Sequence, residues 1–392
     1  MSQVEHTGTH AIDTCAVDVT MLLQGEIPDV QIGYHRAFEL LAADGTIAGY
    51  RAFPYRGART QKAWDTLWDE VVQHMRDRGS NVLHLQNFHW KHAVDPRPAI
   101  ARVRALPQRP VVTTSCGDGF GPRCEPPPRS LLQAASVADA TFTTSMGRLA
   151  SRLVRSGARR VTLIPHSACD VRFGRTAPPI PSDAREFDVV FVGNNHPVHN
   201  VSRRLYWSNR TRYRMTRALA LRYGTRFAVF GHGWESLPGG QGPVAMADQV
   251  AACQRARVVF GGYPHSWEPF YLSDRPFVQA LSAVPIVELR VPRIDAVLAD
   301  GSEWLLASDL DEVVHRIDAL LDGRLDGDAI GQAGAQAVRT RHMSTHRVRL
   351  MTRIFAALLA ARDTDATPVC PPIDYFVPGT DPAVIAEATA RW

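Results

Sequence analysis

The sequence predicts an α/β protein of two doubly wound domains, each built on a parallel sheet. Short apolar, β-branched runs alternate with amphipathic stretches along the 392 residues. This pattern is typical of parallel strands joined by helical crossovers. The length favours two hydrophobic cores. A proline-rich polar segment, 176–185, divides the alternation into two series, since it can continue neither a helix nor a central strand.

The first series lies in residues 1–175 and predicts an N-terminal domain. Its strands are expected at 17–23, 47–53, 81–85, 111–114, 140–143 and 160–164. Helices are expected between them, at 34–43, 60–78, 98–105, 130–135 and 146–156. Gly57, Gly79 and Gly157 stand where turns or helix stops belong.

The second series lies in residues 186–345, beyond the linker at 176–185. Its strands are expected at 188–192, 226–230, 257–260, 285–289 and 303–306, with helices at 208–223, 245–255, 273–284 and 310–321. The tail, 346–392, holds a further helix that we expect to pack back on the N-terminal domain. Ligands are expected between the two domains, at the carboxyl ends of the strands.

Composition excludes several classes of protein. Hydrophobic residues make up 45% and charged residues 21%, which is globular. No apolar run approaches the roughly 20 residues of a membrane span, and the first residues lack a signal peptide, so we expect a cytoplasmic protein. The six cysteines form no CxxC pair, and the ligand-like spacing of His166 and Cys169 has no second pair, so no metal site is expected.

The basic residues are almost all arginine. The net charge is +5, and lysine occurs only at Lys62 and Lys91. The C-terminal two-thirds of the chain therefore contains no lysine that could serve as a P-loop lysine or form a Schiff base. Phosphate must be recognised there by arginines, backbone N–H groups or helix N-termini. The charge is too small and too dispersed to indicate nucleic acid.

Polar and glycine residues follow two strands of the second series. Gly193, Asn194 and Asn195 end the first, where backbone N–H groups can approach a phosphate. The next helix, which Ser208 is expected to cap, places Arg210, Arg214 and Arg217 on one face. These arginines either grip a diphosphate or form a solvated face. After the next strand, Gly231 and Gly233 flank a turn in which Trp234 either stacks on a base or is buried.

A glycine-rich loop follows the strand at 257–260. It carries His265 and Glu268 and runs into a helix that Ser273 is expected to cap. The positive end of that helix favours an anion. Asp274 and Glu268 are candidates to accept sugar or ribose hydroxyls. Alternatively, Asp274 complements the helix dipole or pairs with Arg275.

The order of these segments resembles the GT-B glycosyltransferases, most closely the group named for spore maturation protein B (CgeB-like). The landmarks are FDVVFVGNN, NRTRYRMTRAL, FAVFGHGWE and SDRPFVQALSAVPIVEL, and the stretch 140–174 resembles the end of a GT-B acceptor domain. The resemblance implies two Rossmann-like domains facing each other across a cleft. It also implies that Gly193 and Arg210 contact the donor diphosphate, with Glu268 and 273–275 around the sugar and ribose.

Two positions depart from the family pattern. Retaining relatives have a pair of glutamates here; Glu268 matches the first, but Val278 stands in place of the second. Ala283 stands where the family has a helix glycine. Because valine cannot accept ribose hydroxyls, we expect donor binding to differ, with Asp274 as the substitute. Whether the reaction retains or inverts the anomer is left open.

The acceptor side offers three candidate catalytic residues. His84 and His89 lie at the end of a strand whose carboxyl end should face the cleft, and Asp118 ends the next. Either histidine could serve as a base in an inverting reaction, and Asp118 as a rival base or orienting partner. His84, inside its strand, could instead be structural. The loop 25–33 lies where GT-B enzymes admit the acceptor or the sugar.

The sequence therefore predicts a metal-independent glycosyltransferase. It would use a nucleotide-sugar as co-substrate, without another cofactor, and a small-molecule or glycan acceptor, in natural-product or cell-surface glycan biosynthesis. The alternatives are a non-catalytic protein that binds nucleotide-sugars or glycans on the same fold, and a GT-B epimerase.

Overall fold

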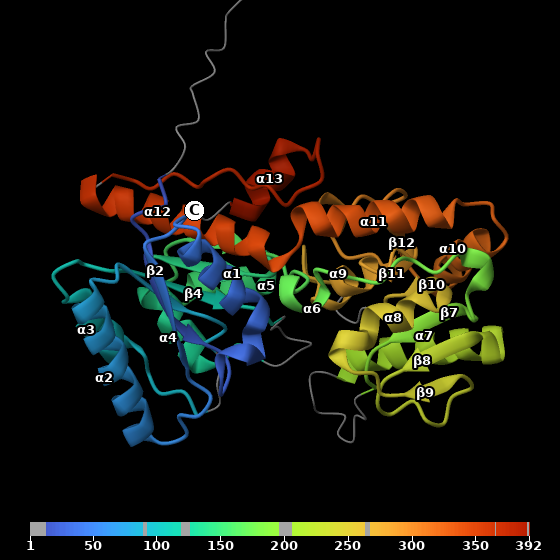
Figure 1. Cartoon of the computed structure of the whole chain (residues 1–392), viewed down its shortest axis with the longest axis horizontal. Coiled ribbons are helices and arrows are strands. Elements are labelled where there is room, and N and C mark those ends of the chain that lie inside the picture. The colour runs from blue at the N-terminus through green and yellow to red at the C-terminus, as the bar shows by residue number, and fades with distance from the viewer. Residues whose placement is uncertain are drawn as a thin grey trace, which may run out of the picture.

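Two parallel sheets organise the chain, one in each half of the sequence (Figure 1). The computed structural model describes residues 13–88, 92–118, 126–195, 206–262, 267–364, 366–389 and 392. In each sheet the first strand lies inside the sheet, and later strands extend it on both sides. This is the doubly wound arrangement, so the predicted fold class is confirmed.

The N-terminal sheet has the strand order β2-β1-β3-β4-β5-β6 with all neighbours parallel. In its register Val19 of β1 lies opposite Tyr50 of β2 and Val82 of β3. The strands are β1 (Asp18–Leu23), β2 (Gly49–Pro54), β3 (Val82–Leu85), β4 (Val111–Cys116), β5 (Ala140–Thr143) and β6 (Val161–Leu163). The helices are α1 (Ile32–Ala43), α2 (Gln61–Arg78), α3 (Arg97–Arg104), α4 (Arg129–Val137), α5 (Arg148–Arg155) and α6 (Asp170–Phe173).

Local capping explains the bounds of α2. The Thr60 side chain accepts a hydrogen bond from the Ala63 N–H at 3.2 Å, which satisfies a donor of the first turn. Gly79 ends the helix with a φ of +74°, a conformation that glycine adopts without a steric cost. The sequence predicted both ends of this helix.

The C-terminal sheet has the order β12-β11-β10-β7-β8-β9, again parallel. In its register Val189 of β7 lies opposite Phe227 of β8 and Val258 of β10. Its strands are β7 (Phe187–Val192), β8 (Phe227–Phe230), β9 (Gly240–Gly242), β10 (Ala256–Phe260), β11 (Ile286–Leu289) and β12 (Leu305–Ala307). Its helices are α7 (Tyr206–Tyr223), α8 (Gln249–Gln254), α9 (Arg275–Ala280), α10 (Leu310–Leu321) and α11 (Gly327–Arg341).

The chain after α11 returns to the N-terminal sheet (Figure 1). The last helices are α12 (Ser344–Thr364) and α13 (Pro382–Thr389). Phe355 of α12 stacks on Phe38 of α1 with 6.5 Å between ring centroids, and its ring lies 6.1 Å from that of Phe142 on β5. Because these rings are buried, α12 is part of the core of the first half of the molecule.

Some predicted helix boundaries were wrong. Helix α7 begins at Tyr206, so Ser208 lies inside the helix and does not cap it. Helix α9 begins at Arg275, so Ser273 is not its cap either, and it ends at Ala280 where the sequence predicted Val284. The early end has a local cause, since the chain turns left-handed at Ala283, with a φ of +56°, shortly before Pro285.

Candidate functional site

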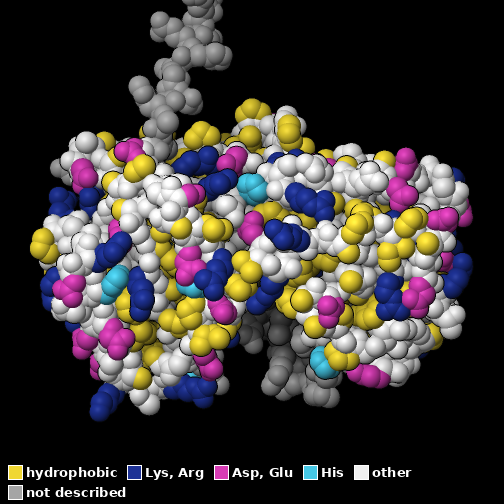
Figure 2. All heavy atoms as spheres, viewed as in Figure 1, with side chains coloured by type: hydrophobic (Ala, Val, Ile, Leu, Met, Phe, Trp, Pro, Cys, Tyr) yellow, Lys and Arg dark blue, Asp and Glu magenta, His cyan; other side chains and the backbone are white. Residues whose placement is uncertain are grey.

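The carboxyl ends of the two sheets each border a cavity, and the two cavities share one carboxylate. The N-terminal cavity measures about 340 Å³ and the C-terminal cavity about 310 Å³. Asp274, from the loop before α9, lines both. Figure 2 shows the surface hollowed between the two halves of the molecule. Doubly wound sheets bind ligands at these ends of their strands, so the two cavities together form the candidate site.

Two glycine turns line the C-terminal cavity. Gly193 follows β7 and Gly231 follows β8, and the Gly193 N–H donates to the Phe230 carbonyl at 2.8 Å. Gly231 has a φ of +143°, and a Cβ there would lie 2.4 Å from the Gly193 carbonyl oxygen. The two turns therefore approach so closely that position 231 requires glycine.

The two asparagines after Gly193 hold these turns together. The Asn194 Oδ1 accepts from the His232 N–H at 3.0 Å, and the Asn195 Nδ2 donates to the Gly233 carbonyl at 3.0 Å. The Asn195 N–H donates to the His232 carbonyl at 2.8 Å. The predicted phosphate contact through the N–H groups of Gly193 and Asn195 is therefore wrong, because both already donate within the protein.

Trp234 also stabilises the turns and does not face the cavity. Its side chain is buried, and its Nε1–H donates to the Gly193 carbonyl at 2.6 Å. Its ring stacks on Tyr213 with a centroid distance of 5.9 Å. The hypothesis that Trp234 stacks on a nucleotide base is therefore corrected, because the protein covers the ring.

Arg275 supplies the positive charge of the C-terminal cavity. It lines the cavity beside Gly193, where a Cβ would lie only 3.1 Å from the Arg275 Cζ. The Arg275 Nη1 is buried and has no hydrogen-bond partner in the described part of the chain. An arginine with unused donors in a cavity is suited to bind a phosphate.

The arginines of α7 differ in their exposure, and Arg217 lies on the solvated face that the sequence favoured for it. Arg214 and Arg217 are exposed, and neither is among the described residues that line the C-terminal cavity. Arg210 is half-buried; it also lies outside that described lining, and its predicted contact with the donor diphosphate stays a prediction. The three side chains do not form a grip on the cavity.

Arg212, on the opposite face of α7, was missed by the sequence reasoning. It is buried, and its Nε donates to the Gly262 carbonyl at 3.2 Å while its Nη1 donates to the Asn194 carbonyl at 3.3 Å. It thus joins the loops that follow β7 and β10. The available signal was periodicity, since Arg212 shares the buried i, i+3, i+4, i+7 face with Met215, Thr216 and Leu219.

The start of α9 presents open polar groups. Asp274 is exposed and occupies the N-cap position without a side-chain capping bond. The Ser273 Oγ is buried and has no hydrogen-bond partner among the described residues. No ion pair between Asp274 and Arg275 is found in the structure. Asp274 is therefore available to a ligand from either cavity.

Glu268 lies in the contact between the two halves. Its side chain is only 2% exposed, and its Oε2 accepts from the Ser145 Oγ at 3.0 Å and from the Arg148 N–H at 3.2 Å. A Cβ on Gly147 would lie 2.4 Å from this Oε2. Burial raises the pKa of the Glu268 carboxyl above its ordinary value. The Oε2 of Glu268 caps α5 of the opposite domain, whereas its Oε1 is buried without a hydrogen-bond partner among the described residues. Glu268 lies outside the described lining of both cavities, and its predicted role as a ligand of the donor sugar stays a prediction.

His84 is buried beneath α12. Its Nδ1 lies 2.9 Å from the Thr113 Oγ1, and its ring is 5.8 Å from the rings of Phe142 and Phe355. Burial lowers the pKa of His84 to about 3, so the ring is neutral at physiological pH. The candidate role of His84 as a catalytic base is corrected, since the side chain does not reach the cleft.

The N-terminal cavity is lined by amides and hydroxyls together with Arg56 and two carboxylates, Asp118 and Asp274. Gln24 follows β1, Gln86 and Asn87 follow β3, and Ser115 lies near the end of β4. The Gln24 N–H donates to the Gln86 Oε1 at 3.0 Å, and the Asn87 N–H donates to the Ser115 Oγ at 3.1 Å. Gln31, from the predicted acceptor loop 25–33, also lines the cavity. These groups can exchange hydrogen bonds with hydroxyls of a neutral ligand.

Asp118 and His166 are titratable residues that line the same cavity. Asp118 is exposed in it, as predicted for a residue near the acceptor. His166, which the sequence suggested only as half of a metal pair, also lines it. The His166 Nε2 hydrogen-bonds to the Gly117 carbonyl. Since a carbonyl only accepts, Nε2 carries a proton, and Nδ1 is an acceptor whenever it carries none.

Arg347 of α12 fixes the loop that carries His166. It is 1% exposed, and its guanidinium donates to the Pro165 carbonyl at 2.9 Å and to the His166 carbonyl at 3.1 Å. Burial lowers the pKa of Arg347 to about 10, which still leaves it charged. The C-terminal helix thereby positions one wall of the N-terminal cavity.

Some expectations concern residues for which the structure gives no description. The predicted donor contact of His265 and the candidate base His89 lie outside the described residues. Within the described ranges, no group of three or more His, Cys, Asp or Glu side chains could hold a metal ion. None of the described helices is both long and apolar enough to cross a membrane.

Comparison with known proteins gave a family and a set of similar folds. Residues 210–353 match a family model described as glycosyl transferase-like. A glycosyltransferase from Rickettsia africae superposes with a TM-score of 0.58 at 8% identity, covering 88% of this chain and 99% of that one. Sucrose-phosphate synthase from Thermosynechococcus elongatus gives 0.55 at 14% identity, covering 88% and 100%. The Anabaena protein HepE, in complex with UDP and glucose, gives 0.53 at 12% identity, covering 86% and 98%. A search of curated proteins gave no significant match.

The two sheets and the cleft between their carboxyl ends define a protein of the GT-B fold. Residues 210–353 of the chain are also similar in sequence to a glycosyl transferase-like family. The match is to the broader glycosyl transferase-like family, so the CgeB-like subgroup stays a prediction.

Proposed function

We propose that the protein transfers a sugar from a uridine diphosphate sugar to a hydroxyl of a small molecule or glycan. The observation that carries the proposal is the position of Asp274, which lines both the N-terminal cavity and the C-terminal cavity. Donor and acceptor bound in the two cavities would meet at this carboxylate. Two of the similar structures support the choice of nucleotide, because the Anabaena protein HepE is in complex with UDP-glucose and an E. coli protein is bound with UDP-2-fluoro glucose.

Arg275 would bind the donor diphosphate in the C-terminal cavity. During transfer the bond between the anomeric carbon and the diphosphate oxygen breaks, and the leaving group gains negative charge. A preorganised guanidinium at that oxygen stabilises the charge more in the transition state than in the ground state. Asp274 would accept donor hydroxyls in place of a second family glutamate, since Val278 is apolar and buried in α9.

The acceptor would bind among the amides of the N-terminal cavity. Its hydroxyl attacks the anomeric carbon and loses a proton, which the Asp118 carboxylate or the His166 Nδ1 could accept. We place the reaction in the cytoplasm, in natural-product or cell-surface glycan biosynthesis, with the nucleotide-sugar as the sole co-substrate.

The test is release of UDP from UDP-glucose and a panel of other nucleotide-sugars, with and without candidate acceptors. We expect release with at least one UDP-sugar. Asp274→Asn should reduce it strongly, while Asp311→Asn, an exposed matched control on α10, should not. Tight donor binding without release would favour a non-catalytic binding protein, and conversion of the donor sugar without transfer would favour an epimerase.

Metal dependence gives a second test. Because Arg275 supplies positive charge for the diphosphate, we expect turnover to continue in excess EDTA. The measurement is UDP release before and after chelation. Abolition by EDTA with rescue by manganese or magnesium would contradict the role given to Arg275.

A further inference from the structure

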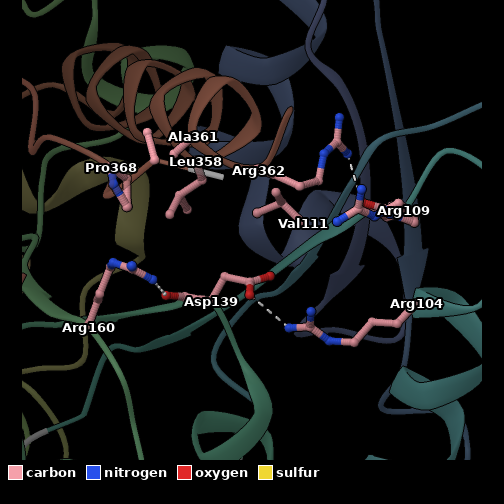
Figure 3. A pocket seen from close by; sticks show the side chains of 11 residues that line it. Arg104, Arg109, Val111, Asp139, Arg160, Leu358, Ala361, Arg362 and Pro368 are labelled. Atoms are coloured by element: carbon pink, nitrogen blue, oxygen red, sulfur yellow. Dashed lines mark hydrogen bonds and ion pairs between the residues drawn. The ribbon is translucent and has the colours of Figure 1, made fainter. Parts of the chain in front are cut away.

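A cavity of about 330 Å³ lies away from the cleft, at the amino ends of the N-terminal strands (Figure 3). Its wall includes residues that come directly before or at the start of β4, β5 and β6, namely Val111, Asp139 and Arg160. The opposite wall is the end of α12 and the segment after it. The candidate active site lies at the other ends of the same strands, so this cavity is a separate feature.

The lining is strongly positive. It holds four guanidinium groups, from Arg104, Arg109, Arg160 and Arg362, and one carboxylate, from Asp139. The lining thus carries three positive charges in excess. On the face shown in Figure 2, by contrast, basic and acidic side chains are interspersed.

The single carboxylate is already satisfied. The Asp139 Oδ1 pairs with the Arg104 Nη2 at 2.9 Å, and its Oδ2 accepts from the Val112 N–H at 2.8 Å. Asp139 therefore neutralises Arg104, and each of its two carboxylate oxygens already has a partner other than Arg109, Arg160 or Arg362. The remaining positive charge lies on Arg109, Arg160 and Arg362.

Two of these three arginines lack a carboxylate partner within the described ranges. Arg160 donates one hydrogen bond, from Nη1 to the Asp139 carbonyl at 3.2 Å, and Arg109 forms no ion pair there. Arg362 pairs with Asp363 at 2.6 Å and donates to the Gln108 and Arg109 carbonyls at 2.9 and 2.7 Å. Figure 3 shows the side chains of Arg104, Arg109, Arg160 and Arg362 around a common space.

The geometry is fixed by three separate parts of the chain. Arg362 ties α12 to the loop before β4, in which Arg109 has a φ of +48°, an uncommon conformation for a residue other than glycine. Leu358, Ala361 and Pro368 give the cavity an apolar wall (Figure 3).

We propose that this cavity binds a small phosphate-bearing anion, distinct from the nucleotide-sugar of the cleft. Guanidinium groups bind phosphate oxygens through paired, planar hydrogen bonds. Arg109 and Arg160 have the donors for such bonds, and Arg104 and Arg362 add positive potential. The cavity volume accommodates a phosphate or diphosphate group. The bound anion would tie α12 to the amino end of the N-terminal sheet.

The experiment measures binding of inorganic phosphate and of pyrophosphate to the full chain by calorimetry, at constant ionic strength. The wild type should bind one of them saturably at this cavity. Arg109→Gln/Arg160→Gln should weaken that binding by about tenfold or more, as expected for lost charge-assisted hydrogen bonds. Arg159→Gln is the matched control, because Arg159 is an exposed neighbour that does not line the cavity.

Arg275→Gln separates this site from the cleft. Since the two sites lie at opposite ends of the strands, binding at the arginine cavity should change by less than about twofold in that variant. Anion binding that disappears with Arg275→Gln and survives Arg109→Gln/Arg160→Gln would overturn the proposal, as would no saturable binding by the wild type. If the double variant does not fold, Arg160→Gln alone replaces it, with the same expected direction.

Discussion

Two short helices start at the cleft, and their first turns differ in how their polar groups are used. The donors at the start of helix α5 are closed, since the Glu268 Oε2 from the other half of the molecule accepts from the Ser145 Oγ and the Arg148 N–H. The Glu268 Oε1 is buried and has no hydrogen-bond partner among the described residues. Helix α9 is open, since the Ser273 Oγ and the Arg275 Nη1 have no partner among the described residues. Buried donors are normally satisfied.

The difference indicates which of the predicted donor-site residues stabilise the fold and which are available to a ligand. The resemblance placed both Glu268 and the start of α9 around the donor. The structure assigns Glu268 to the contact between the domains and leaves Asp274 and Arg275 open to the cavities. Unused donors at a cavity mark the place where a ligand completes the hydrogen bonding.

The largest effect is expected at the open helix start. Arg275→Gln should weaken UDP binding by about 1.5–3 kcal/mol, the worth of a charge-assisted hydrogen bond. Thermal stability should change little, because no carboxylate among the described residues loses a partner. Calorimetry with UDP and thermal unfolding measure the two quantities.

Arg217→Gln is the control for Arg275→Gln, since Arg217 is exposed on α7. It should leave UDP binding unchanged. Equal losses from the two variants would mean that the donor responds to net charge alone, and the contrast between the two helix starts would lose its meaning.

At the closed helix start, the expected effect is on stability. Glu268→Ala leaves the Ser145 hydroxyl and the Arg148 N–H without their acceptor, which should cost about 1–3 kcal/mol of unfolding free energy. Glu268→Gln retains an accepting oxygen and should cost less. Urea unfolding followed by fluorescence gives both values, and a destabilisation of Glu268→Gln equal to that of Glu268→Ala would show that charge, not capping, holds the contact.

The pH dependence of Glu268 has a definite sign. Because its pKa is raised in the folded state, its contribution to stability is full below the ordinary carboxyl pKa and is lost as the pH rises through the folded pKa. Glu268→Gln does not titrate, so its stability relative to the wild type should increase from about pH 4 to about pH 7. Glu235, whose pKa is lowered by backbone N–H groups, should give the opposite trend in Glu235→Gln at lower pH: relative to the wild type, the stability of the variant should increase as the pH falls below the ordinary carboxyl pKa of about 4.3.

A smaller effect on donor binding is expected from Gly193→Ala. The added Cβ would lie 3.0 Å from the Phe191 Cζ and 3.1 Å from the Arg275 Cζ, so the guanidinium must shift. UDP affinity should fall, by less than for Arg275→Gln. Gly57→Ala is the matched control, because a Cβ on Gly57 meets no atom within 4 Å. A wild-type affinity for Gly193→Ala would show that the close approach of Arg275 to Gly193 is not needed.

Much of the fold could be predicted because its signals are local. Apolar runs and turn residues placed β1, β7 and α2 nearly to the residue. The sequence did not predict helix α11, because most of its residues are small or polar. Its Gly331 and Gly334 lie against backbone carbonyls of other segments. The two glycines allow α11 to approach Ala283 and Glu303 closely, and this tertiary contact cannot be predicted from a local sequence pattern.

The site could be predicted in part, for the same reason. The sequence placed Asp118 and Asn194 at strand ends and Asp274 and Arg275 at a helix start, and the structure brings them to the two cavities. It could not show that Trp234 and His84 are covered, because Tyr213 and Phe355 come from distant segments. Nor could it show that Glu268 pairs with residues more than a hundred positions away.

The smallest effect is expected where α9 ends. Ala283 is 4% exposed and has a φ of +56°, a conformation that costs an L-residue about 1–2 kcal/mol relative to glycine. Ala283→Gly relieves this cost, loses a buried methyl and makes the unfolded chain more flexible, so its stability should stay near that of the wild type. Ala280, buried in α9 with helical geometry, provides the matched control, and Ala280→Gly should be destabilised by about 1 kcal/mol. The two variants should therefore differ by about 1 kcal/mol in urea unfolding. Equal destabilisation would mean that α9 continues through Ala283 in solution. The helix whose open start lies at the cleft would then be longer than Arg275–Ala280.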